Sequence, residues 1–214
     1  MIINMFSKLH KIRPIPMVCM GQIKKSILFS AKIGIILGIV AKILDSPMMP
    51  STISNLGLIG SQWGVWIFIS TLISVFSYTP RLATIRVFIF LISMLLSYYT
   101  YTILVLGLFP LKYILFWCII AILSIVPSYI MWFARGDSLI SKIITALPIA
   151  IIAIEGYIVY RSAMNYYAEY MQYENILISR GPFWFMISTE IVYALLIVAI
   201  LLLVPVKSKA NTKF

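Results

Sequence analysis

Charged residues are scarce in this chain: they make up only 11% of its 214 residues, whereas apolar residues make up 62%. Soluble globular domains average about 25% charged and about 45–50% apolar residues. A soluble protein of this length needs more polar side chains than this to cover its core. The composition therefore excludes an ordinary soluble domain and predicts an integral membrane protein.

Residues that commonly carry catalysis or bind metals are rare as well. The sequence has one histidine, His10, and two cysteines, Cys19 and Cys118, in different parts of the chain. Their spacing predicts neither a disulfide nor a zinc site. The sequence has no protease motif and no glycine-rich phosphate loop. We therefore expect no catalytic residue, no metal and no cofactor, and we interpret the chain as non-enzymatic.

Long apolar runs are what the sequence does have. Six of them reach spanning length, at roughly 26–44, 60–78, 82–106, 110–133, 138–160 and 183–205. A helix of about 20 residues crosses about 30 Å of hydrocarbon, and lipid forces the backbone to hydrogen-bond within the helix. We predict an all-α membrane bundle of six helices within residues 26–206, between a basic arm, 1–25, and a basic tail, 207–214.

The basic residues predict how this bundle is oriented. If the six helices alternate in direction, one side of the membrane receives Lys8, Lys11, Arg13, Lys24, Lys25, Arg81, Arg86, Arg135, Lys142, Lys207, Lys209 and Lys213. The other side receives only Lys112, Arg161 and Arg180. Short cytoplasmic loops hold the excess of Lys and Arg, so both termini are predicted to be cytoplasmic. The net charge of +11 then indicates a lipid bilayer as the partner, and not nucleic acid.

Three ionisable residues fall within the spans near the outer side: Lys42, Glu155 and Glu190. An ionised side chain in hydrocarbon costs about 2.5–3.5 kcal/mol or more, so such residues usually face the bundle interior or water. We expect the three to line one polar pocket that opens outward. In the alternative interpretation Lys42 snorkels and pairs with Asp45, and Glu155 reaches the headgroups. Glu190 is deeper and has no partner on its own helix.

Aromatic residues gather in the predicted outer half. They are Trp63, Trp66, Tyr98, Tyr99, Tyr101, Tyr113, Trp117, Tyr157, Tyr160, Tyr166, Tyr167, Tyr170, Tyr173 and Trp184. An ordinary aromatic belt decorates both interfaces. We expect Trp63, Trp66, Tyr98 and Tyr99 to contact a small amphipathic ligand; the alternative is an outer belt plus a surface helix.

Two outer connections are predicted to be structured. The segment 162–177, SAMNYYAEYMQYENIL, has tyrosines on one face and polar residues on the other. This pattern predicts an amphipathic helix on the outer leaflet between the fifth and sixth spans, where it can also cover the pocket. The connection 45–62 is rich in Pro, Gly, Ser and Asn, which predicts a structured loop or short re-entrant segment.

A stripe of small residues runs along the first span. Ser30, Gly34 and Gly38 repeat every four residues, a spacing that lets another helix approach closely. The stripe either packs within the bundle or docks a membrane protein partner through helix one. Pro127 and Pro148 lie inside the fourth and fifth spans and are expected to kink them.

The runs GIILGIVAKILD, 34–45, and SVFSYTPRLATIRVFIFLISMLLSYYTYT, 74–102, together resemble a family of small bacterial membrane proteins known as a domain of unknown function. The spacing of Gly34, Gly38, Lys42 and Asp45 and the corner at Pro80 and Arg81, which leads into Phe88, Phe90, Met94, Tyr98 and Tyr99, carry this resemblance. The resemblance covers most of 26–205 and implies a multi-pass fold in a bacterial plasma membrane, without catalytic residues.

The architecture is also similar to the substrate-binding S-components of energy-coupling-factor vitamin transporters. This likeness implies that the helix-one stripe faces a transmembrane coupling partner and that a ligand sits under the first outer loop. The chain departs from the usual Ala-xxx-Ala pattern, because Ala31 is followed four residues later by Ile35.

Two functions follow from these expectations. In the first, the protein binds a small solute or lipid from the outer side, as a transport subunit does; Lys42 meets an anionic group, and Glu155 and Glu190 meet a cationic or donor group. In the second, it is a structural, regulatory or immunity protein that acts through protein contacts.

Overall fold

The structure, a computed structural model, describes residue 13 and residues 16–44, 59–60, 62–107, 109–136, 138–173 and 181–204, with the side chains of 163 and 166–185 left out. Throughout these residues the chain is helical or irregular, with no strand. Asp45, most of the connection 45–62, the first part of the arm and the tail 207–214 lie outside the described residues.

Five stretches are long and apolar enough to cross a membrane: Met20–Leu44, Pro80–Leu106, Leu111–Arg135, Leu139–Ser162 and Met186–Leu203. They belong to α2 (Met20–Leu44), α5 (Pro80–Leu106), α6 (Leu111–Leu123) with α7 (Ile125–Met131) and the 3-10 turn η1 (Trp132–Arg135), α8 (Leu139–Tyr173) and α9 (Gly181–Leu203). The prediction of an all-α multi-pass membrane protein is therefore confirmed in the described part of the chain.

The second predicted span, 60–78, is shorter in the structure. Its helix, α4, covers only Trp63–Val75, about 20 Å at 1.5 Å per residue. The chain leaves the helix at Phe76 and turns into α5, where Thr79 caps the new helix by accepting a hydrogen bond from the Leu82 backbone N–H at 3.1 Å. Pro80 follows this cap at the first helical position, where its missing N–H has no cost.

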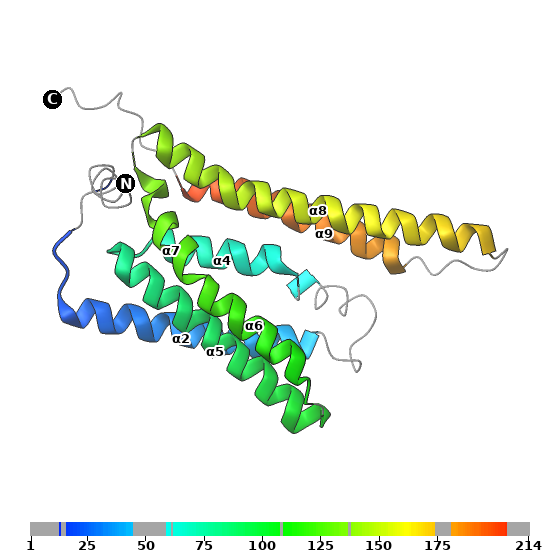
Figure 1. The fold of residues 1–214 in the computed structure, drawn as a ribbon, viewed down its shortest axis with the longest axis horizontal. Helices are drawn as coiled ribbons and strands as arrows, with labels where there is room; N and C mark the ends of the chain where they lie inside the picture. Colours follow the sequence, from blue (N-terminus) through cyan, green and yellow to red (C-terminus); the bar gives the residue numbers. More distant parts are fainter. Residues whose placement is uncertain are drawn as a thin grey trace.

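α2 and α5 pack side by side and run in the same direction. Four contacting pairs along the two helices have the same sequence separation of 56 residues: Ser30 with Arg86, Gly34 with Phe90, Gly38 with Met94, and Lys42 with Tyr98. A constant separation requires two parallel helices in register. The chain between them must therefore return along the bundle, and α4 runs in the opposite direction to both (Figure 1).

The small-residue stripe forms this α2–α5 contact. Ser30, Gly34 and Gly38 are all buried, and a methyl group added at Gly34 would meet the Phe90 carbonyl oxygen and lie 3.1 Å from the Met94 backbone nitrogen. The stripe therefore packs within the bundle, and a helix of the same chain covers the surface that a docked partner would need. The predicted docking role of these three residues is corrected accordingly.

α4 lies between the two halves of the bundle (Figure 1). On one side Trp66 and Ile73 belong to a core shared with α2, α5 and α6. On the other, Val75 belongs to a second core with η1, α8 and α9, which includes Trp132 and Tyr193. α4 thus joins α2, α5 and α6 to α8 and α9.

Proline has different effects in the fourth and fifth spans. The helix is interrupted at Ser124, three residues before Pro127, where Pro127 cannot donate to the preceding turn. Pro148 lies inside α8 without interrupting it. α8 also continues as one helix through 162–173, so this part of the predicted surface helix is the extension of α8. Its position at the membrane surface stays a prediction.

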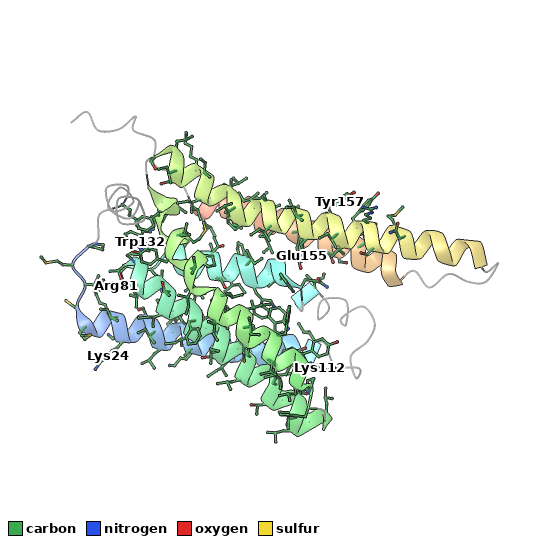
Figure 2. The ribbon with its side chains drawn as sticks, viewed as in Figure 1. Lys24, Arg81, Lys112, Trp132, Glu155 and Tyr157 are labelled. Carbon is green, nitrogen blue, oxygen red and sulfur yellow. The ribbon has the colours of Figure 1, made fainter. Side chains whose placement is uncertain are left out.

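The ends of the bundle differ in composition. We call the end at which α2, α5 and α8 begin the basic end, because it carries Lys24, Lys25, Arg81, Arg135 and Lys142. We call the opposite end the aromatic end, after Trp63, Tyr98, Tyr99, Tyr113 and Trp117. Lys24 and Arg81 lie at one end in Figure 2 and Lys112 at the other.

Candidate functional site

A cavity of about 260 Å³ lies at the aromatic end. It is lined by Lys42 of α2, Trp66 of α4, Tyr98, Tyr99 and Thr102 of α5, and Tyr113 and Trp117 of α6, together with Gly60, Met94, Leu95 and Pro110. Four of the residues predicted to bind a ligand, Lys42, Trp66, Tyr98 and Tyr99, therefore lie around one cavity. Thr102, Tyr113 and Trp117 were not among the predicted site residues. The available signals were the position of the two rings in the outer aromatic group and the spacing of Thr102, four residues after Tyr98.

Lys42 brings the cationic group to this cavity. Only 9% of the residue is exposed, and its ammonium lies 3.4 Å from the Tyr98 hydroxyl and 4.9 Å from the centre of the Tyr98 ring. Aromatic faces attract cations, and the attraction strengthens where water is excluded. The cavity thus combines one buried positive charge with a largely aromatic wall.

Trp63 supports the cavity from outside. Its ring lies 6.2 Å from that of Trp117, at an interplanar angle of 64°, and 6.1 Å from that of Phe116. The side chain is 48% exposed and does not line the cavity. Trp63 therefore positions the cavity wall through Trp117, and its predicted ligand contact stays a prediction.

Glu155 and Glu190 do not line this cavity. They lie on the other side of α4, between the start of that helix and the α8–α9 pair. Glu155 accepts a hydrogen bond of 2.7 Å from the Trp63 backbone N–H, and Figure 2 shows its side chain on the side of α8 that faces α4. We expected Lys42, Glu155 and Glu190 to line a single pocket. In the structure Lys42 lies on one side of α4 and the two glutamates lie on the other.

Tyr193 joins the two carboxylates. The residue is 2% exposed, and its hydroxyl lies beside Glu155 and Gly64 and interacts with Glu190 as well. Tyr193 was not among the predicted site residues. The available signal was its spacing, since Tyr193 follows Glu190 by three residues and therefore shares its helix face.

The basic end holds a third polar cluster. Arg13 donates to the carbonyl oxygens of Val75 at 3.0 Å and Trp132 at 2.6 Å and lies 4.1 Å from the centre of the Trp132 ring. The Trp132 indole N–H donates to the Ser77 carbonyl at 2.7 Å. Arg86, buried on α5, donates to the hydroxyls of Ser30 and Ser77, each at 3.0 Å. The Arg13 contacts connect the arm to the end of α4 and to the start of η1.

Arg13 remains cationic in this position. Burial, with a further contribution from nearby Arg135, lowers the pKa of its guanidinium to about 10, still well above neutral pH. Its positive charge lies at the carbonyl ends of α4 and α7, where a helix favours cations. The predicted basic arm therefore contacts the bundle at this residue.

A scan against protein-family models and searches of curated proteins and of solved structures found no match for this chain.

Proposed function

We propose that this protein is a non-enzymatic membrane protein that binds a small amphipathic solute or lipid headgroup in the cavity at the aromatic end. The observation that carries the proposal is the buried ammonium of Lys42 beside a cavity of about 260 Å³ lined largely by aromatic rings. Binding sites for drug-sized molecules are usually about 300–1,000 Å³, apolar and equipped with a few polar groups. The ligand is accordingly small, with an anionic group for Lys42 and a flat or apolar body.

The membrane topology proposed here has six crossings, with both termini in the cytoplasm of a bacterial cell and the cavity facing outward. Its support is the parallel packing of α2 and α5, because two parallel spans need one return crossing between them and α4 runs in that direction. The accumulation of Lys and Arg at the basic end supports the orientation. Access from the outer side fits a substrate-binding subunit of a transporter.

Native mass spectrometry of the purified protein tests the proposed function. We expect the wild-type protein to retain a small molecule that Lys42→Ala loses, because the anionic group no longer has its counterion. The matched control is Lys112→Ala, which removes a lysine at the same end that does not line the cavity. This variant should retain the molecule.

Two results would overturn the binding proposal. One is a retained molecule that survives both Lys42→Ala and Trp66→Ala. The other is a stoichiometric protein partner copurified without any small molecule, which would favour a structural or regulatory role through protein contacts.

A further inference from the structure

The start of α4 brings together oxygen atoms from α8 and α9. A methyl group added at Gly64 would lie 2.9 Å from the Tyr193 hydroxyl oxygen and 3.0 Å from Oε2 of Glu155. A methyl group at Gly156 would lie 3.4 Å and 3.5 Å from the two carboxylate oxygens of Glu190 and 3.3 Å from the Tyr193 ring. Glycine at these two positions leaves room for both carboxylates to approach the Tyr193 side chain.

Oε2 of Glu155 and Oε1 of Glu190 are buried without a well-aligned hydrogen bond to any described residue. The same holds for the Tyr193 hydroxyl, although it lies close to Glu155. Most buried polar atoms in proteins have a partner, and a buried group without one costs about 1–3 kcal/mol, or more when it is charged. Tyr193 is 2% exposed, so bulk water does not solvate its hydroxyl. Three such atoms in one place indicate a ligand that supplies positive charge.

The surrounding helices do not supply that charge. α4, which covers the cluster on one side, contains no ionisable residue over Trp63–Val75. The described ionisable groups that act on the Tyr193 hydroxyl are Glu155 and Glu190, both acidic. Glu155 receives one neutral hydrogen bond, from the Trp63 backbone N–H. Ionisable residues placed at this depth in a membrane protein commonly mark an ion or substrate pathway.

We propose that Glu155, Glu190 and Tyr193 bind a hard inorganic cation between α4, α8 and α9. Two carboxylates and a phenol offer oxygen donors only, which is the preference of Na⁺, K⁺, Mg²⁺ and Ca²⁺. The cluster contains no imidazole and no thiolate, which are the ligands that softer transition metals favour. A cation here neutralises the two carboxylates and fixes the start of α4 against α8 and α9.

This site is separate from the Lys42 cavity, although α4 contributes to both. Its test uses cations alone and needs no ligand for the cavity. Failure of the cation site and failure of the proposed function are therefore distinguishable.

The experiment measures thermal unfolding of the detergent-purified protein by far-UV circular dichroism. NaCl, KCl, MgCl₂ and CaCl₂ are each compared with choline chloride at equal ionic strength, because a ligand of the folded state raises the unfolding temperature with its concentration. We expect at least one of the four cations to give a saturable increase in the wild-type protein. The increase should be lost in Glu155→Gln and Glu190→Gln and reduced in Tyr193→Phe.

The matched control is Glu169→Gln, which removes a carboxylate from the same helix, α8, fourteen residues beyond Glu155. This variant should keep the full increase. If the glutamine variants do not fold, Tyr193→Phe and equilibrium dialysis of the wild-type protein with radioactive ²²Na⁺ or ⁴⁵Ca²⁺ decide the question. If the unfolding temperature of the wild-type protein is the same in all four cations as in choline, ordered water is the partner of these oxygens and the cation site is overturned. The cation site is also overturned if Glu155→Gln and Glu190→Gln keep the increase in unfolding temperature.

Discussion

The two ends of the bundle differ in whether their buried polar groups have hydrogen-bond partners. At the basic end, Arg13, Arg86 and Trp132 donate to carbonyl and hydroxyl oxygens of neighbouring segments. Toward the aromatic end, Glu155, Glu190 and Tyr193 each have a buried oxygen without a partner among the described residues, and a cavity lies on the other side of α4.

This difference separates stability from binding. Satisfied polar groups hold a structure together, whereas buried groups without partners lower stability and persist where they serve another purpose. The basic end is therefore the end whose buried polar groups have partners, and in our proposal a ligand contributes stability at the aromatic end. Substitutions at the two ends should then separate loss of stability from loss of binding.

The largest expected effect is that of Trp132→Ala at the basic end. Trp132 is fully buried, contacts Arg13 and donates to Ser77, and the loss of a buried Trp typically costs about 3–5 kcal/mol. The free energy of unfolding, measured by circular dichroism during titration with sodium dodecyl sulfate, should fall by about this amount.

Trp63→Ala at the aromatic end is the counterpart. Trp63 is 48% exposed, so the same truncation should lower the free energy of unfolding far less. Equal losses in the two variants would remove the distinction between a fixed end and a binding end.

The second prediction concerns the α2–α5 contact at Ser30, Gly34 and Gly38, called the seam below, which extends from one end of the bundle toward the other. In Gly34→Val the new side chain meets the Phe90 carbonyl oxygen and lies 3.0 Å from Cβ of Ser93. Backbone atoms cannot move aside as a flexible side chain can, so we expect a loss of about 1–3 kcal/mol in the same titration. Gly21→Val places the same residue on α2 where nothing lies within 4 Å and should cost much less; similar costs would show that the seam is not tightly packed.

The third prediction sharpens the role of the arm. Arg13→Met removes three hydrogen bonds from a cation to carbonyl oxygens. Because the residue is only partly buried, we expect a loss of about 1 kcal/mol. Lys24→Met, an exposed cation on α2, is the control and should leave the free energy of unfolding nearly unchanged. An unchanged value for Arg13→Met would mean that the arm contributes nothing to the basic end.

Much of the fold was predictable because the apolar composition of each helix indicates that it lies in a membrane. The apolar runs indicated the helices in the right order. Lys42, Trp66, Tyr98 and Tyr99, which were expected to contact one ligand, lie around one cavity, and their contact with a ligand stays a prediction. The length of an apolar run does not determine how much of the run is helical, however. α4 is therefore shorter than the predicted span 60–78.

The arrangement of neighbours was not predictable in the same way. The residue pattern on a helix face indicates that the face is buried, but it does not indicate which helix covers it. The stripe at Ser30, Gly34 and Gly38 was therefore also consistent with a helix of another protein. Similar depth suggested that Lys42, Glu155 and Glu190 share one pocket. Depth does not specify position around the bundle, and α4 separates the lysine from the two carboxylates.

The smallest expected effect has the opposite sign and belongs to Glu190→Gln. Glutamine keeps the size of the side chain but removes a negative charge from a site where Oε1 is buried without a partner, and its amide supplies a donor for Glu155 or Tyr193. In choline buffer, without alkali or alkaline-earth ions, the free energy of unfolding should stay the same or rise by up to about 1 kcal/mol. A clear loss of stability would instead place Glu190 among the satisfied groups that hold the bundle together, and the contrast between the two ends would fail at this residue.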